Sequence, residues 1–167
     1  TPAGGVTKIT SNDYDDDCCQ VSGDRVVWEG RPGSDVEIFT WTPAGGVNQL
    51  TSNDYDDVGP QVSGDRVVWY GSDGIDYEIF TWTPADGVAQ LTSDTRDDDR
   101  NPQVSGDRVV WEGRDGYDDH DGEIFTWTPA GGVTQLTSNG DIDGSPQVSG
   151  DRVVWEGSDG FDYEIFT

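Results

Sequence analysis

The chain has 167 residues, which is enough for one domain with a sizeable hydrophobic core, and we expect a single domain. Its 34 Asp and Glu residues outnumber 9 Lys and Arg, for a net charge of −25. Nucleic acids and anionic membrane surfaces are poor partners for such a chain, because phosphate binding depends on Lys and Arg. Cations are the expected ligands. Seven Trp, six Tyr and five Phe argue against disorder, and the sequence lacks the run of about 18 apolar residues that a membrane span needs.

A repeat of about 40 residues runs through the whole chain. Repeats of ~40–45 residues with several short strands are typical of propeller blades, whereas helical repeats of that length show apolar residues at 3.6 spacing. No helical spacing occurs here, so we predict an all-β protein. Aligned at the motif "TPAGG" or its variant "TPADG", the repeat units cover residues 1–41, 42–82, 83–127 and 128–167.

Each unit is predicted to contain four short strands. The turn "SGD" is short enough for a tight hairpin, and the segment "RVVW" that follows it is apolar at successive positions. Such a segment is expected to be covered on both faces by neighbouring blades, with its Trp filling the space between them. In the second unit the predicted strands are 47–51 ("VNQLT"), 60–63 ("PQVS"), 66–71 ("RVVWYG") and 77–82 ("YEIFTW").

The two ends of the sequence predict how the blades close. The chain begins with "TPAGGVTKIT", the last strand of a blade, and stops at "FDYEIFT", after a third strand. We therefore expect a closed four-bladed β-propeller of four-stranded antiparallel blades, with the N-terminal strand completing the last blade. Two alternatives stay open: a segment of a larger propeller, or a polymer in which the leading strand completes a blade of the next copy. The absence of Met indicates a processed or excised segment.

The pattern "PQVSGDRVVWEGSDGFDYEIFTW…GGVTQLTSN" resembles the TolB-type propeller repeat, which has a "SPDG" hairpin, an apolar strand, a loop leading into "D-I-Y" and a closing "LT". Here "VSGD" takes the place of the hairpin, "DYEIF" that of the third strand and "QLT" that of the fourth, over essentially the whole chain. The resemblance implies a β-propeller in a periplasmic, cell-surface or extracellular setting, with a role in protein interaction or as a domain attached to an enzyme.

Aspartates are concentrated in two loops of every unit. Of the 27 Asp, 13 precede "QVSGD" and 9 follow "RVVW", and strand order predicts that both loops open on the same face. Two positions carry Asp in all four units, and oxygen ligands in Gly-containing loops suit Ca²⁺ better than Zn²⁺. We therefore predict one pair per unit as calcium ligands: Asp16 with Asp35, Asp57 with Asp76, Asp99 with Asp121, and Asp143 with Asp162.

Other candidate residues are weaker. "NGDIDG" (139–144) matches only the start of a calcium loop, and the same Asp and Gly residues are ordinary turn formers. His120 is more simply read as a solvated side chain than as a metal ligand. Cys18 and Cys19 are adjacent, so a disulfide between them cannot link distant parts of the fold. Three alternatives stay open: a strained vicinal disulfide, a disulfide to another chain, or two free thiols. The four "GDR" motifs suggest ion pairs between blades.

The sequence predicts a protein without enzymatic activity. Glu29, Glu112 and Glu156 recur as equivalents, whereas a glycosidase needs unlike carboxyl groups to converge. We expect a calcium-binding extracellular or cell-surface propeller, or a periplasmic one, that acts as a structural or protein-interaction module and is able to assemble into fibres through its N-terminal strand. Alternatives are a carbohydrate-binding propeller or an accessory domain of an enzyme whose catalytic part lies elsewhere.

Overall fold

The computed structural model describes residues 5–93, 98–114 and 121–167, and these form fifteen β-strands with no helix. The strands build four antiparallel sheets in chain order. The first sheet contains β1 (Asp16–Ser22), β2 (Arg25–Gly30), β3 (Glu37–Thr42) and β4 (Gly46–Gln49). The second contains β5 (Asp57–Ser63), β6 (Arg66–Ser72), β7 (Tyr77–Thr83) and β8 (Gly87–Gln90). The third contains β9 (Arg100–Ser105), β10 (Arg108–Gly113), β11 (Glu123–Thr128) and β12 (Gly132–Gln135). The fourth contains β13 (Asp143–Ser149), β14 (Arg152–Ser158) and β15 (Tyr163–Phe166).

The "SGD" turn forms the tight hairpin that the sequence predicts. Ser63 pairs with Arg66 across the turn, and Gly64 adopts a φ of 58°. Glycine is favoured at this position because it enters the left-handed region at no steric cost. The same turn therefore joins the first two strands of every sheet.

A second recurring irregularity is a β-bulge in the first strand of each sheet, where the register shifts two residues after the strand begins. The bulge residue has positive φ in all four sheets, whether it is a glycine or not. A bulge twists the strand and re-aims its side chains. The four bulge residues are Cys18, Gly59, Asn101 and Ser145.

The core lies in the junctions between consecutive sheets. In the first junction Val27 and Ile38 pack against Val67 and Trp69, and all four are fully buried. The "RVVW" strand is covered on both faces, which explains its continuous apolar pattern. The second junction repeats the arrangement one sheet later with Val68, Ile79, Val109 and Trp111. The prediction that the Trp of this strand fills the space between blades is confirmed for Trp69 and Trp111.

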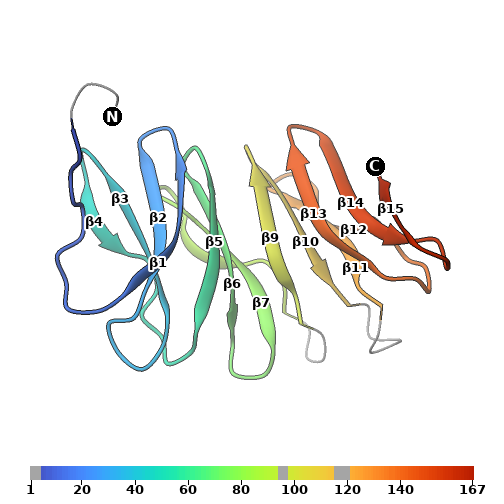
Figure 1. Ribbon diagram of the computed structural model, residues 1–167, viewed down its shortest axis with the longest axis horizontal. Coiled ribbons are helices and arrows are strands. Elements are labelled where there is room, and N and C mark those ends of the chain that lie inside the picture. Colours follow the sequence, from blue (N-terminus) through green and yellow to red (C-terminus); the bar gives the residue numbers. More distant parts are fainter. Residues whose placement is uncertain (1–4, 94–97, 115–120) are drawn as a thin grey trace.

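The four sheets stand side by side in chain order, with the first and the fourth at opposite ends of the row (Figure 1). The expected closure of a four-bladed ring is therefore wrong. Residues 5–15 form no strand, and β13–β15 is a three-stranded sheet in the described residues, so the leading segment does not complete the last blade. Each sheet packs against the next, β5 on β1, β2 and β3, and the rotations between the four successive sheets do not add up to a full circle (Figure 1).

The repeat units and the sheets are offset from one another. The second unit, 42–82, contributes β4 to the first sheet and β5 to β7 to the second. Each unit therefore links two neighbouring blades, as the sequence predicts for a propeller whose fourth strands follow "TPAGG".

In the described residues no helix is long and apolar enough to span a membrane.

Candidate metal centre

The Asp-rich loops meet at one edge of the molecule, which we call the acidic edge. In the second sheet Asp57 pairs with Gly71, so the loop that enters β5 lies beside the loop that leaves β6. The first and fourth sheets have the same register, with Asp16 opposite Gly30 and Asp143 opposite Gly157. The "SGD" turns join the other ends of these strands. The prediction that both acidic loops open on the same side is confirmed.

The first recurring Asp of each unit accepts a hydrogen bond from the Trp twelve residues later. Trp69 Nε1 donates to Asp57 Oδ1 at 2.8 Å. The second oxygen, Oδ2, accepts from Asn53 Nδ2 at 2.6 Å. Equivalent indole bonds are made by Trp28 to Asp16 (2.9 Å), Trp111 to Asp99 (2.8 Å) and Trp155 to Asp143 (3.0 Å). These four carboxylates fix the Trp side chains of the core, a role that the sequence analysis missed although the constant spacing of twelve residues is visible in it.

Replacing Asp57 by alanine is expected to lower the free energy of unfolding by roughly 2–4 kcal/mol. Asp57 is only 2% exposed, and its loss leaves the buried Trp69 indole N–H without an acceptor. Equilibrium urea unfolding followed by circular dichroism measures the change. Asp54→Ala, at an exposed position of the same loop, is the control and is expected to change stability by less than about 0.5 kcal/mol. Equal effects of the two substitutions would contradict the structural role of Asp57.

The second recurring Asp lies at the junction with the following sheet. The backbone N–H of Asp57 donates to the carbonyl of Val36 at 2.9 Å, which places Asp57 beside Asp35 of the preceding unit. At the next junction Asp99 donates in the same way to Tyr77, the residue after Asp76. The structure thus brings Asp35 together with Asp57, and Asp76 together with Asp99, across junctions. The third junction matches, with Asp143 bonded to Gly122, the residue after Asp121.

A third carboxylate at each junction was not predicted. Glu37, Glu78 and Glu123 are 3%, 0% and 0% exposed, and each is the first or second residue of the third strand of its sheet. The Asp two positions before the Glu lies close to it: the Asp35 carboxyl interacts with that of Glu37, and Asp76 and Glu78 each place a carboxylate oxygen within 4.8 Å of the other. That spacing is constant in the four copies of "EIF" and is the signal that could have revealed the Glu. Each junction in the described residues therefore contains two Asp and one Glu.

The first junction has an unusual electrostatic environment. Burial raises the pKa of the Glu37 carboxyl to about 7, and the neighbouring Asp57 and Asp35 add to the shift, while a hydrogen bond from Thr51 opposes it. Burial also raises the pKa of Asp57. Oε2 of Glu37 is buried and accepts no hydrogen bond from the described residues. Nor does a described Lys or Arg form an ion pair with any of the three carboxylates. This site lacks a positive partner.

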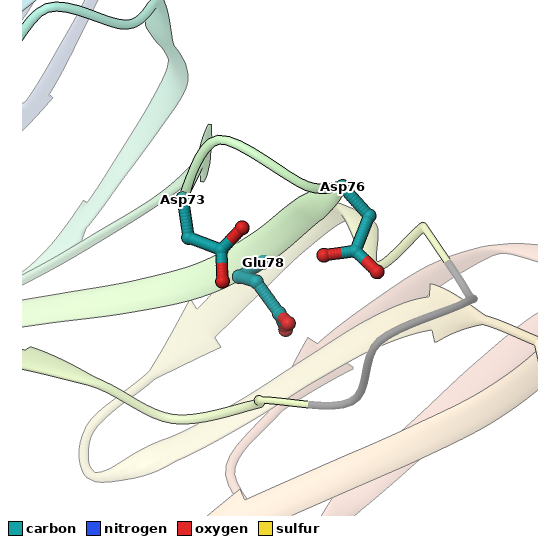
Figure 2. Close-up of side chains that lie close together, drawn as sticks. All are labelled: Asp73, Asp76 and Glu78. Carbon is teal, nitrogen blue, oxygen red and sulfur yellow. The ribbon is translucent and has the colours of Figure 1, made fainter.

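At the second junction a further Asp joins the cluster. Figure 2 shows Asp73 and Asp76 on the loop between β6 and β7, with their carboxylates turned toward that of Glu78 at the start of β7. One oxygen from each lies within 4.8 Å of the others. The Thr92 hydroxyl donates a short hydrogen bond to Glu78. Glu78 is buried whereas Asp73 is exposed, so the cluster opens from the junction to the acidic edge.

The fourth unit carries the same residue types without a following sheet in the described chain. Asp159, Asp162 and Glu164 are all exposed there. His120 and most of the loop that contains it lie outside the described residues, so the structure does not bear on its role. The "NGDIDG" segment instead folds as a turn that places Asn139 Nδ2 2.8 Å from Asp143 Oδ2.

The donor set of the junctions fits a hard cation. Asp35, Glu37 and Asp57 offer carboxylate oxygens, and Ca²⁺ takes six to eight oxygen ligands in flexible geometry. Zn²⁺ prefers His and Cys, and the described residues at this junction include neither. A cation here would meet the unpartnered Glu37 oxygen. One Glu and two Asp per junction are therefore the residues that would hold Ca²⁺ there, and the Asp pair within each unit stays a prediction from the sequence.

The structure also shows the contacts of the "GDR" motifs, the two Cys residues and two of the Tyr residues. The "GDR" ion pairs between blades are confirmed: Arg25 bonds Asp65 at 2.8 Å. Cys18 and Cys19 are exposed free thiols in the described structure. Tyr70 and Tyr77, which lie near the acidic loops, pack edge to face with ring centroids 5.7 Å apart.

Comparisons with known proteins support the architecture. No family model matches the chain, and no curated protein matches it. Solved structures do: TolB from Acinetobacter baumannii has a TM-score of 0.67 at 15% identity, over 94% of this chain and 41% of that one. The acylaminoacyl peptidase of Pyrococcus horikoshii has a TM-score of 0.67 at 13% identity, over 92% of this chain and 25% of that one. The β-propeller domain of the Trilobed protease from Pyrococcus furiosus, described as having an open velcro topology, also reaches 0.67 at 13% identity, over 89% and 48%.

These identities establish the fold alone. The chain spans less than half the length of each of the three structures. The arrangement of four consecutive sheets in a row, joined by fourth strands that lead into the next blade, is that of adjacent propeller blades. By its fold the chain is a row of β-propeller blades, similar in structure to TolB from Acinetobacter baumannii.

Proposed function

We propose that the protein is a non-catalytic propeller module that binds Ca²⁺ at its sheet junctions and serves as a structural or protein-interaction element, with assembly into larger structures. The observation that carries the proposal is the Glu37 carboxylate. Its Oε2 is buried without a hydrogen-bond partner in the described residues, and Asp35 and Asp57 lie around it. An isolated buried carboxylate is costly unless it is protonated or meets a cation.

The repetition of the junction strengthens this reading. Buried Glu and Asp recur at three successive junctions, where ordinary turn formation does not require a buried charge. A cation at each junction would link the third strand of one sheet to the first strand of the next. Bound calcium would therefore stabilise the packing between neighbouring blades, and its removal would weaken this packing.

The net charge and the type of site suit an extracellular, cell-surface or periplasmic location. Calcium sites of extracellular modules work at Kd values of about 10⁻⁴–10⁻³ M, which a site assembled from a few carboxylates between sheets is able to reach. The structural likeness to TolB agrees with a location in the cell envelope, although it shows the fold alone.

A second candidate function is an accessory domain of an enzyme. It is favoured by the likeness to a peptidase of which this chain covers 25%, and to the propeller domain of a protease. In this case the calcium junctions would stabilise a propeller that supports a catalytic domain elsewhere in the protein. A parent sequence containing a hydrolase domain would favour this reading.

Glu37→Gln is expected to separate the cost of burying the Glu37 charge from the contribution of this carboxylate to calcium binding. Gln keeps the shape and removes the charge, so the calcium-free variant is expected to be more stable than the parent, by about 1–3 kcal/mol at pH 8. Its stabilisation by Ca²⁺ is expected to shrink, because one ligand is lost. Thermal unfolding in chelator and in excess Ca²⁺ measures both quantities.

Asp86→Asn is the matched control, since it removes one charge from an exposed turn that faces away from the acidic edge. It is expected to leave the calcium response unchanged. If Ca²⁺ and chelator give the parent chain the same melting temperature, the calcium proposal is wrong.

A further inference from the structure

Consecutive sheets are joined by recurring polar contacts, of which an ion pair and a hydrogen bond to a Ser hydroxyl occur at all three junctions. The first contact is an ion pair at the hairpin edge, with Arg25 bonded to Asp65 at 2.8 Å and Arg66 to Asp107 at 3.0 Å. The third junction keeps it in a longer form, with Arg108 and Asp151 at 3.6 Å. In each case the earlier sheet supplies Arg and the later sheet supplies Asp.

Arg25 and Arg66 also stack on an aromatic ring of the following sheet. The guanidinium carbon of Arg25 lies 5.0 Å from the centre of the Trp82 ring. Arg66 lies at 5.1 Å from that of Trp127. Both Arg residues are only 9% exposed, so ion pair and ring contact are largely shielded from water.

A second contact uses the residue before the hairpin turn. The Ser22 hydroxyl accepts a hydrogen bond from the backbone N–H of Gly64 in the next sheet at 2.9 Å. The equivalent bonds, from Gly106 to Ser63 and from Gly150 to Ser105, have the same length. A third contact joins Glu29 Oε1 to the N–H of the bulge residue Gly59 at 2.7 Å.

The fourth sheet carries, on its free face, the half of these contacts that the earlier sheet supplies at each junction; we call this the tail face (Ser149, Arg152, Glu156 and β15). Its Ser, Arg and Glu are all exposed, in contrast to the buried Arg25 and Arg66. Ile165 is 73% exposed, whereas its three equivalents Ile38, Ile79 and Ile124 are 0% exposed.

The first sheet carries the other half on its free face, which we call the head face (Cys18, Val21, Gly23, Asp24 and Trp41). Asp24 is equivalent to Asp65, Gly23 to Gly64, and Trp41 to Trp82. Val21 is 67% exposed although its equivalent Val62 packs against the core of the first junction. The bulge N–H of Cys18 corresponds to that of Gly59, which receives the Glu contact.

We propose that the tail face of one chain docks on the head face of a second copy, using the same contacts as the internal junctions. Arg152 would pair with the partner's Asp24 and lie over the partner's Trp41, Ser149 would accept from the partner's Gly23, and Ile165 would be covered. The two faces are complementary in charge and shape because the three internal junctions already join equivalent surfaces. Such a head-to-tail contact closes into a ring or continues as a filament.

The segment that precedes β1 fits the same arrangement. Residues 5–9 ("GVTKI") correspond to 46–50 ("GVNQL"), which form β4 and pair with β3. In the single chain this segment forms no strand, and Val6 is fully exposed. When the head face docks on a tail face, residues 5–9 of the second copy would lie beside β15, the sheet edge that lacks a fourth strand. The docking would thus cover this edge, which is a natural site for strand addition.

This inference deepens the structural role in the proposed function, but it rests on contacts at the hairpin edge and needs no bound calcium. The experiment is sedimentation velocity of the 167-residue chain over a range of concentrations, in ~0.15 M salt to screen the net charge. We expect species of two or more chains. Arg152→Glu and Asp24→Arg should each raise the concentration required for association by at least about tenfold.

The double variant with Arg152→Glu and Asp24→Arg reverses the ion pair and is expected to restore association to within about threefold of the parent. Asp86→Arg, a charge reversal in an exposed turn, is the control and should leave association unchanged. Because Arg152 and Asp24 are exposed, the variants are expected to keep the circular dichroism spectrum of the parent. A parent chain that stays monomeric at all concentrations, or association that no single substitution weakens, would overturn the proposal.

Repeating the sedimentation in chelator separates this inference from the calcium proposal. Association that persists in chelator supports the docking contact whatever the outcome of the calcium experiments. Association that disappears in chelator while Arg152→Glu has no effect in Ca²⁺ would overturn the docking contact and would assign the assembly to the metal junctions.

Discussion

Trp69→Ala is expected to lower the free energy of unfolding by about 3–5 kcal/mol, the usual cost of removing a buried aromatic side chain. Trp69 is fully buried between the first and second sheets and stacks on Phe80 with ring centroids 5.9 Å apart. Its removal empties the centre of a junction and deprives Asp57 of its indole donor. Urea unfolding followed by far-ultraviolet circular dichroism measures the loss.

Trp155→Ala is the matched control, because the same residue occupies the same strand position in the fourth sheet. Trp155 faces the third sheet, as Trp69 faces the first, but it is only half-buried beside an open cavity that Arg108 and Leu136 also line. We expect a loss of about 1–2 kcal/mol, well below that at Trp69. Equal losses at the two positions would contradict the claim that the depth of burial of this Trp sets its contribution to stability.

Acidification is expected to stabilise the calcium-free protein. The pKa of Glu37 rises from an ordinary value of 4.5 to about 7 in the folded chain. Between these values the folded state holds a proton that the unfolded state has released, so the free energy of unfolding falls as the pH rises from about 4.5 to about 7. The slope for one such carboxyl is at most about 1.4 kcal/mol per pH unit. The raised pKa of Asp57 acts in the same direction.

Calcium is expected to reverse this trend, because the bound cation replaces the proton and requires ionised carboxylates. Urea unfolding at pH 5 and pH 8, in chelator and in excess Ca²⁺, gives the four free energies of unfolding that this comparison needs. Glu37→Gln, which cannot ionise, should flatten the slope in chelator. A calcium-free protein that is more stable at pH 8 than at pH 5 would contradict the assignment of a raised pKa to Glu37.

Much of the fold could be predicted from the sequence because the same physical pattern is repeated four times. The continuous apolar run in "RVVW" indicates a strand covered on both sides, and the Gly in "SGD" marks the hairpin. Predicted strands 66–71 and 77–82 correspond to β6 (Arg66–Ser72) and β7 (Tyr77–Thr83). Repetition turns a weak local signal into a strong one, since every copy must satisfy the same packing.

The closure of the ring could not be predicted, because the angle between sheets depends on how closely their side chains interlock. Contacts such as Ser22 with Gly64 and Val36 with Asp57 join both edges of neighbouring sheets and set that angle. Blade count alone does not contain this information. The expectation that four copies make a full circle assumed an angle that the packing does not provide.

The candidate site was only partly predictable. The recurring Asp could be found because charge in a loop is conspicuous, but the partner of each Asp depends on which loops meet across a junction. Asp57 has two roles: it holds Trp69, and it lies beside Asp35 and Glu37 of the sheet before it. Glu37 was missed because a Glu at the start of an alternating strand is usually a solvent-facing residue.

The most direct test of the account is a crystal structure grown with Tb³⁺, a strong anomalous scatterer that replaces Ca²⁺ at oxygen-rich sites. The account predicts anomalous density between Asp35, Glu37 and Asp57, and at the equivalent positions of the second and third junctions. Glu37→Gln crystals should lose or weaken the first of these peaks. Peaks found only at exposed Asp side chains, with none at the junctions, would contradict the central claim that the buried carboxylates hold cations between the blades.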